Sequence, residues 1–324
     1  MSPNLVKVRE LIKDNSQALK LRVIAGTSGL DNHIDGKELY RPGLALAGFL
    51  DRFPDGRVQL IGNIESSFLN SLSPSARTIA VTKLFEQKIP CIFITGKNHI
   101  LPVMKKLADE KKILLVASSS TTSEVHFRLT NYLILRLAPR DSIHGSLVDV
   151  YGTGLLFIGR AGIGKSEIAL DLVERGHRLV ADDIVDITVK QPDILIGSGP
   201  ELLKQLIEIR GVGIINVREI FGVRAVRLQK RVETVVELKD WNDQEDYERL
   251  GITQQYTEYL GINIPKILLP IYPGKNITVI AEAIALNLHL NIYGYHAGKD
   301  LARRVQNGMK AKRHINDYLR WDNE

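Results

Sequence analysis

The chain has 324 residues, with 43 Lys and Arg against 37 Asp and Glu, and 44% of its residues are hydrophobic. This length predicts two domains, and the composition is that of a globular protein able to bury ordinary cores. A net charge of +6 is too small to indicate nucleic-acid binding, and a single cysteine excludes a disulfide framework within the chain.

The first segment, residues 1–15, is polar and places Leu5, Val8 and Ile12 on one helical face. It lacks the apolar centre of a signal peptide. The longest stretch without charge, residues 283–298, contains Asn, His and Gly, so we expect no membrane span. These features predict a cytoplasmic protein without membrane association.

Residues 1–135 alternate short apolar runs with helical patterns, which predicts an N-terminal α/β layered domain. The expected strands are 21–24, 58–61, 92–95 and 113–117, and the expected helices are 74–87, 101–111 and 121–137. The run Ser118–Ser120 offers N-caps for the last helix. The sequence of these residues contains no phosphate-loop, metal-binding or nucleophile motif, so we favour an assembly or regulatory role over a small-ligand pocket.

Residues 136–143, which include Ala138-Pro139-Arg140-Asp141-Ser142, are expected to form a linker. A second domain then spans 144–324 and opens with a hairpin, 147–158, around Gly152-Thr153-Gly154. His144 precedes this hairpin. On its own, a lone histidine is more often structural than catalytic.

The segment 155–176 contains a phosphate-binding loop pattern between an apolar strand and a helical pattern that ends near Gly176. Glycines permit close approach of the backbone, while loop amides and the helix N-terminus face phosphate oxygens. Lys165 adds a positive charge, and the Ser166 hydroxyl suits Mg²⁺. The candidate nucleotide-binding residues are Gly159, Arg160, Ala161, Gly162, Ile163, Gly164, Lys165 and Ser166.

The segment 177–183 is short, apolar and acidic at its end, which favours a parallel strand that brings Asp182 and Asp183 to the active edge of a sheet. Strand alternation predicts that the two carboxyl groups point to opposite faces and do different jobs. A solvated turn is the alternative, although acids this close to a phosphate loop more often face Mg²⁺ and the nucleophile.

Further along, Glu208 and Arg210 alternate with isoleucines and should share one face of a strand before the turn at Gly211 and Gly213. Glu208 is either a metal ligand or one member of an edge-strand ion pair. Arg249 lies in a polar segment, where an arginine is solvated by default but can also stabilise transferred phosphoryl charge.

The end of the chain predicts two helices. Asn276 is expected to cap the first, which runs to about residue 290. Residues 297–320 predict a basic amphipathic helix, either packed on a core stripe or available to a protein partner.

Together these stretches resemble the bacterial HPr kinase/phosphorylase family over essentially the whole chain. The resemblance rests on Arg41-Pro-Gly-Leu, His144-Gly145, Gly162-Ile-Gly-Lys-Ser-Glu167, Arg175-Gly-His-Arg-Leu-Val-Ala-Asp-Asp183, Ile207-Glu-Ile-Arg-Gly-Val-Gly-Ile-Ile-Asn216, Tyr247-Glu-Arg-Leu250 and Pro273-Gly-Lys-Asn276. It implies a C-terminal P-loop kinase domain similar to phosphoenolpyruvate carboxykinase around the nucleotide site.

The resemblance implies a bifunctional enzyme that uses ATP and Mg²⁺ to phosphorylate a seryl residue of the phosphocarrier HPr. It also implies removal of that phosphate by inorganic phosphate, with release of pyrophosphate, in the control of carbon metabolism. Members of this kind are homohexamers, and many respond to fructose 1,6-bisphosphate. No nucleic-acid or membrane partner is implied.

By the same resemblance, Asp183 matches the acid that accepts and returns the seryl proton, with Asp182 beside it. Ser166 and Glu208 match Mg²⁺ ligands, and Lys165 matches the phosphate-binding lysine. His144 and Arg249 match residues needed for turnover, which raises His144 from a structural to a catalytic candidate. Residues 207–216 match a segment required in both directions, and 270–275 a loop important for phosphate removal.

Two readings compete with this one: a small-molecule kinase on the same carboxykinase-like core, and a non-catalytic nucleotide sensor. The sequence also departs from the family at the loop, which usually reads Gly-Asp-Ser-Gly and here reads Gly159-Arg160-Ala161-Gly162. This change is expected to alter nucleotide preference or the balance between the two reactions, while the backbone cradle is kept.

Overall fold

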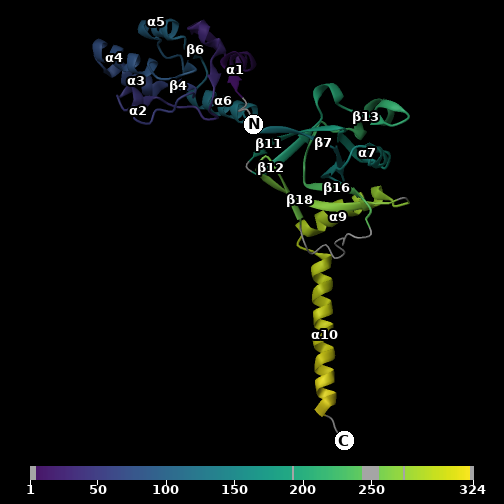
Figure 1. Ribbon diagram of the computed structural model, residues 1–324. Coiled ribbons are helices and arrows are strands. Elements are labelled where there is room, and N and C mark those ends of the chain that lie inside the picture. Colours follow the sequence, from purple (N-terminus) through teal and green to yellow (C-terminus); the bar gives the residue numbers. More distant parts are fainter. Residues whose placement is uncertain (1–4, 192, 243–254, 273, 322–324) are drawn as a thin grey trace. The chain divides into compact units, whose positions relative to one another are not determined.

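The computed structural model describes residues 5–191, 193–242, 255–272 and 274–321 (Figure 1). The chain divides into two compact units, Met1–Pro139 and Arg140–Glu324. Both are built from helices and sheets, which confirms the predicted α/β class. The assignment of domain roles to 1–135 and 144–324 stays a prediction.

The first unit contains a four-stranded sheet in the order β2-β6-β5-β4. Strands β4 (Gln59–Ile61), β5 (Cys91–Ile94) and β6 (Leu114–Ser118) are parallel, and β2 (Leu21–Ala25) is antiparallel to β6. Because successive strand side chains point to opposite faces, the sheet separates two apolar cores. All four strands predicted for this half of the chain are confirmed.

Helices cover this sheet, and four of them were predicted: 74–87, 101–111, 121–137 and the helical pattern within residues 1–15. The longer helices are α1 (Val8–Asn15), α3 (Asn63–Ser71), α4 (Pro74–Phe85), α5 (Pro102–Lys111) and α6 (Thr122–Arg136). The smaller elements are β1 (Val6–Lys7), β3 (His33–Ile34) and α2 (Gly43–Leu46). The predicted cap of α6 was wrong by one position, because Thr121 rather than a serine accepts the bond from the Glu124 amide.

The expected linker at 136–143 is not a free connection. Arg136 ends α6, and β7 (Arg140–His144) already pairs with β11 (Ile184–Gln191) of the second unit. The polar residues that predict a linker are therefore edge-strand residues, because a strand paired on one side leaves its other side to water.

The second unit is organised around a six-stranded sheet in the order β10-β8-β9-β16-β18-β17. Its strands are β8 (Ser146–Val150), β9 (Thr153–Ile158), β10 (Arg178–Ala181), β16 (Thr234–Asp240), β17 (Gln255–Tyr259) and β18 (Ile262–Ile271). Strands β9, β16 and β18 are parallel, and the predicted hairpin is the β8–β9 pair. The carboxyl ends of the parallel strands thus share one edge.

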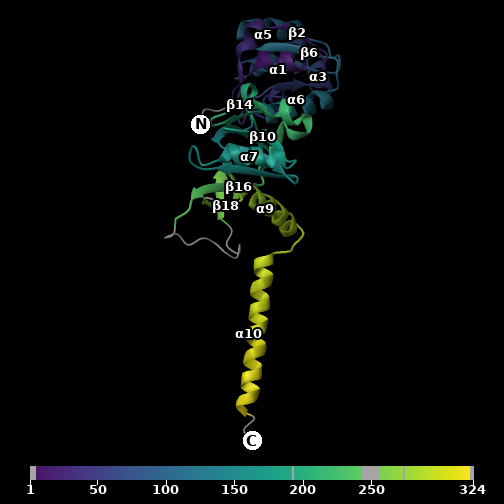
Figure 2. The ribbon, with the colours of Figure 1, turned by 90° about the vertical axis from the view of Figure 1, so that its right-hand side faces the viewer.

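Strand β9 shows how this sheet is buried on both faces. Leu155 and Phe157 join a core with α7 (Lys165–Glu174) and α9 (Ile277–Ile292), which Figure 2 shows against the sheet. Leu156 points the other way, into a core shared with a second sheet of order β15-β12-β11-β7. That sheet includes β12 (Ile194–Ser198) and β15 (Gln229–Arg231).

The prediction of a parallel strand at 177–183 was wrong in its pairing. Strand β10 is antiparallel to its neighbour β8, and β8 is antiparallel to β9. Two reversals leave β10 running in the same direction as β9. Its carboxyl end therefore reaches the edge where β9 delivers the phosphate loop, as the sequence predicted.

The second unit also contains a further hairpin and two further α-helices. A hairpin of β13 (Leu206–Ile209) and β14 (Gly213–Asn216) is followed by α8 (Val217–Phe221) and, at the end, by α10 (Ala297–Trp321). The larger apolar side chains that the structure describes on α10, Leu301, Val305 and Met309, are 50%, 52% and 68% exposed, so residues 297–309 form no core stripe. Asn276 caps α9, as predicted.

Within the described residues, no helix taken alone has the length and apolar character needed to cross a membrane. Only α9 and residues 297–309 together, across a bend of 69°, meet that test by length and composition.

Phe157 is fully buried at the end of β9, one residue before the strand passes into the phosphate loop. We expect Phe157→Ala to lower the free energy of unfolding by about 3–5 kcal/mol, because it leaves a cavity under the loop. Tyr293→Ala is the matched control, since that ring is 87% exposed. Denaturant unfolding measures both, and an equally small effect of the two changes would contradict this packing.

Candidate active site

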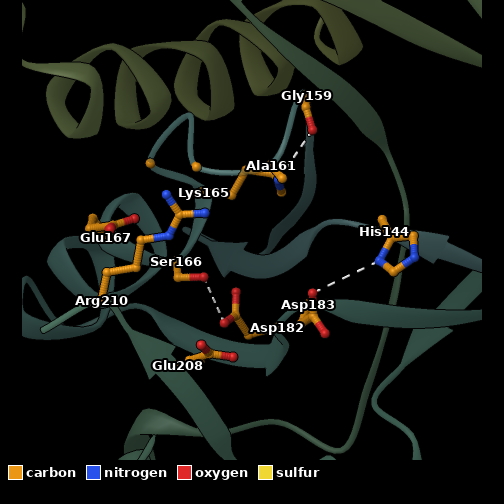
Figure 3. A pocket seen from close by; sticks show the side chains of 12 residues that line it. His144, Gly159, Ala161, Lys165, Ser166, Glu167, Asp182, Asp183, Glu208 and Arg210 are labelled. Carbon is orange, nitrogen blue, oxygen red and sulfur yellow. Dashed lines mark hydrogen bonds and ion pairs between the residues drawn. The ribbon is translucent and has the colours of Figure 1, made fainter. Parts of the chain in front are cut away.

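A pocket of about 430 Å³ lies where the segments predicted for chemistry meet (Figure 3). Strands β9 and β10 end at this edge of the sheet, and β8, which is antiparallel to both, begins there. The residues that line the pocket are His144, Gly159, Ala161, Gly162, Gly164, Lys165, Ser166, Glu167, Asp182, Asp183, Glu208 and Arg210. Antiparallel pairing thus brings together groups from three separate parts of the chain, and the β13–β14 hairpin, a separate sheet, adds a fourth.

The phosphate loop, residues 159–166, has the backbone that its glycines permit. Gly159, Gly162 and Gly164 have φ values of 147°, 76° and 102°, which disfavour any residue with a Cβ. Helix α7 begins at Lys165, so its free amides face the loop. The Lys165 ammonium donates to the carbonyls of Gly159 and Arg160 at 3.1 and 3.2 Å.

Two members of the predicted loop do not line the pocket. Ile163 is 9% exposed and packs in the core beneath the loop. The Arg160 guanidinium turns to Asp240 at the end of β16, with Nε–Oδ2 and Nη2–Oδ1 distances of 2.6 and 2.8 Å. This bidentate pair lowers the pKa of the Asp240 carboxyl. The charge that is unusual for the family is therefore paired.

Asp182 is buried, with 4% of its surface exposed, and both of its oxygens are engaged. The hydroxyls of Ser146 and Ser166 donate to Oδ1 and Oδ2 at 2.5 and 2.8 Å. Burial raises the pKa of this carboxyl, while the serine hydrogen bonds and the amides of Asp183 and Glu208 oppose the rise. Asp182 thus joins β8, α7 and β13 around the pocket.

Asp183 faces the open pocket, and its side chain is 64% exposed. Its carboxylate Oδ1 lies 3.8 Å from His144 Nδ1 (Figure 3). The two acids diverge as predicted, but strand alternation is not the cause, since β10 ends at Ala181. Instead Asp183 has a φ of 63°, and its carbonyl accepts a hydrogen bond from the Gly145 amide at 3.0 Å.

Glu208 and Arg210 reach the pocket from the β13–β14 hairpin. Ile207, between the strand start and Glu208, is 1% exposed in the core, so the charged residues lie on the opposite face as predicted. The sequence placed Arg210 on this strand and, by the resemblance, within the segment 207–216 required in both directions, but gave it no role of its own. It also omitted Glu167, in the first turn of α7. Alternation with buried isoleucines was the available signal for Arg210.

Two predicted features are not among the described residues that line this pocket. Arg249 and the segment 247–250 lie outside the described residues, as does Pro273 of the expected loop 270–275. Lys275 does not line the pocket; its ammonium donates to the Pro270 carbonyl at 2.6 Å and lies over the Tyr272 ring. Burial lowers the pKa of Lys275.

The chain matches two known domain families. One is described as HPr Serine kinase N terminus and matches residues 6–133; the other, HPr Serine kinase C-terminal domain, matches residues 135–305. The HPr kinase/phosphorylase of Chloroherpeton thalassium is 45% identical over 300 residues, which cover 93% of this chain and 88% of the relative. That of Bacillus cytotoxicus is 41% identical over 298 residues, covering 92% and 96%.

Among solved structures, the Hpr(Ser) kinase/phosphatase from Coxiella burnetii is 36% identical in sequence. It covers 50% of this chain and 98% of its own, with a TM-score of 0.45.

Burial raises the pKa of Asp182 above its ordinary value of 3.8, so the folded state prefers the protonated form. The Asp182 carboxyl therefore contributes its full stabilisation of the folded state at pH values below 3.8. That contribution is lost as the pH rises through the pKa that the group has in the folded state. Asp182→Asn stays neutral, and we therefore expect its stability relative to the original chain to increase from about pH 4 to pH 7. Denaturant unfolding across this range tests the sign; a difference that falls with pH would contradict it.

Proposed function

The chain belongs to the HPr kinase/phosphorylase family, and we propose that it transfers the terminal phosphate of ATP to a seryl hydroxyl of an HPr-type phosphocarrier. In the reverse direction it removes that phosphate with inorganic phosphate and releases pyrophosphate. One observation supports this most: the phosphate loop, the exposed Asp183 carboxylate and Glu208 line a single pocket. A nucleotide sensor needs only the first of these.

The charges of the pocket favour a nucleotide bound with Mg²⁺. Four carboxyl groups and only two permanent cations, Lys165 and Arg210, line it. A triphosphate alone would be repelled by these carboxylates. Bound Mg²⁺ supplies charge neutralisation between phosphate oxygens and the protein.

The available ligands fit Mg²⁺ in this role. Ser166 and Glu208 offer hard oxygen donors, which this ion prefers. Among the residues that the structure describes, no three His, Cys, Asp or Glu side chains cluster as a metal cage. That arrangement suits an ion held by one or two protein oxygens together with substrate phosphates, which is how Mg²⁺ is commonly bound.

Asp183 is the group proposed to move the proton. Its pocket-facing carboxylate orients the seryl hydroxyl while the seryl oxygen bonds to the terminal phosphorus and the bond to the ADP oxygen breaks. The hydroxyl proton passes to Asp183 late in the transfer. Asp182 does not suit this job, because both of its oxygens already accept hydrogen bonds from serines.

The reverse reaction uses the same groups. Inorganic phosphate attacks the phosphorus of phosphoserine, the bond to the seryl oxygen breaks, and protonated Asp183 returns its proton to that oxygen. The products are the free seryl hydroxyl and pyrophosphate. His144, whose Nδ1 lies 3.8 Å from Asp183 Oδ1, is proposed to orient that carboxylate, and Arg249 remains a candidate for phosphoryl charge stabilisation.

The resemblance extends this proposal to the level of assembly and cell. We propose a cytoplasmic homohexamer that regulates carbon metabolism through its carrier. A small-molecule kinase remains the competing outcome if no carrier protein accepts phosphate.

Asp183→Asn is expected to lower both carrier phosphorylation and phosphorolysis by about 10²- to 10⁴-fold, because the amide cannot accept the proton. Mass spectrometry of an HPr-type carrier, and separately of its phosphoserine form with inorganic phosphate, measures the two directions. Asp193→Asn serves as the control, since Asp193 is exposed and does not line the pocket. Retained phosphorolysis in Asp183→Asn would show that the proton role is misassigned.

Lys165→Ala is expected to remove most of the stabilisation that ATP and Mg²⁺ give to the folded chain. At a ligand concentration of about 100 times Kd, that stabilisation is about 2.7 kcal/mol. Thermal unfolding with and without the nucleotide measures it, and Lys299→Ala, an exposed lysine on α10, should behave like the original chain. Equal stabilisation of all three proteins would argue against phosphate binding by the loop.

A further inference from the structure

Two aromatic side chains lie at the carboxyl edge of the six-stranded sheet and are not among the residues that line the pocket described above. Trp241 follows β16 and Tyr272 follows β18, and these two strands are parallel neighbours. The rings meet edge to face, with centroids 5.6 Å apart and an interplanar angle of 76°. The Trp241 amide donates to the Ile271 carbonyl at 3.0 Å, so the strand ends hold the two rings together.

Both rings are held in place and yet remain open. Trp241 is 47% exposed and Tyr272 is 45% exposed. The Lys275 ammonium lies 5.2 Å from the centroid of the Tyr272 ring and donates to the Pro270 carbonyl at 2.6 Å. This cation fixes the ring without covering it. A fixed, half-open aromatic pair offers a surface on which another flat ring system can stack.

The phosphate loop is tied directly to the strand that carries Trp241. Gly159 approaches β16 so closely that a Cβ built on it would lie 2.6 Å from the Leu238 carbonyl oxygen. The next residue, Arg160, makes its bidentate ion pair with Asp240, the residue before Trp241. The loop charge that is unusual for the family thus fastens the loop beside the aromatic pair.

The order of the strands places this pair on the side of the loop opposite to the proposed transfer groups. Along the sheet the order is β10, β8, β9, β16 and β18. Asp183 follows β10, on one side of β9, whereas Trp241 and Tyr272 follow β16 and β18 on the other side. Neighbouring strands are about 4.8 Å apart, so the aromatic pair begins one strand spacing from the loop. A nucleotide whose terminal phosphate points to Asp183 therefore directs its nucleoside end toward this pair.

We propose that Trp241 and Tyr272 form the subsite for the base of the nucleotide. This rests on the proposed function, because it identifies where the rest of the molecule lies when its phosphates occupy the loop. The base stacks on the aromatic pair, and contact between flat π systems supplies the affinity. Because every base has a π face, this subsite adds affinity for a nucleoside and selects little among bases.

Ligands with and without a base separate this role from phosphate binding. We expect Tyr272→Ala to weaken binding of a non-hydrolysable ATP analogue with Mg²⁺ by about fivefold or more, the loss typical for removal of one stacking ring. Binding of inorganic triphosphate with Mg²⁺, which has no base, should change by less than about twofold. Titration calorimetry on the full chain measures both ligands.

Two matched variants control for the loss of a tyrosine. Tyr272→Phe keeps the ring and should retain the affinity for the ATP analogue within about twofold. Tyr295 is 47% exposed and follows the other end of α9, whose 16 residues span about 24 Å. Tyr295→Ala should therefore leave both affinities unchanged.

A spectroscopic measurement leaves the subsite intact. The chain contains two tryptophans, so Trp321→Phe makes Trp241 the only indole in the sequence. In that variant the ATP analogue should change the Trp241 emission, because a base stacked on the pair alters the surroundings of the indole. Inorganic triphosphate should leave the emission nearly unchanged.

Equal loss of both ligands in Tyr272→Ala would overturn the inference, since it would mean that the ring only supports the phosphate loop. Unchanged affinity for the ATP analogue would overturn it as well, as would a Trp241 emission that responds equally to both ligands or to neither. In each of these cases the original chain still binds nucleotide and the proposed function stands. If the original chain binds neither ligand, the proposed function fails, and this inference fails with it.

Discussion

The buried carboxyl group of Asp182 is the interaction on which the architecture of the pocket depends. It accepts hydrogen bonds from Ser146 at the start of β8 and from Ser166 at the start of α7. It is also close to the amides of Asp183 and Glu208. A buried carboxyl group is costly unless its oxygens are satisfied, so these segments must keep their places for the fold to remain stable. The same constraint holds the pocket together.

Because Asp182 is held in this way, it and the neighbouring Asp183 have different roles in the proposal. Asp182 is sequestered, whereas Asp183 is 64% exposed in its side chain and faces the open pocket near His144. A single residue with positive φ makes the difference, and such backbone strain persists only where surrounding contacts impose it. The Gly145 amide, which binds the Asp183 carbonyl, supplies one of those contacts. In this proposal, the strained backbone conformation of Asp183 directs its carboxyl group into the pocket.

Much of this could be predicted from sequence because its signals are local. The phosphate loop, its helix and the strand before it follow from glycine spacing and apolar periodicity. The pairing of β10 with β8 could not be predicted, because alternation within a strand carries no information about the direction of its neighbour. Family resemblance, rather than spacing, put Asp183 and Glu208 in one site. Alternation with isoleucines put Arg210 beside Glu208, but it could not show that the Arg210 guanidinium lies close to Gly162, some fifty residues earlier in the chain.

The most direct measurement is a crystal structure of the chain with Mg²⁺, a non-hydrolysable ATP analogue and an HPr-type carrier. We predict that the terminal phosphate lies in the pocket beside Lys165, with the seryl oxygen within hydrogen-bond distance of the Asp183 carboxylate and Asp182 still bound to Ser146 and Ser166. A terminal phosphate outside this pocket, or a seryl oxygen bound to Asp182 in place of Asp183, would contradict the account.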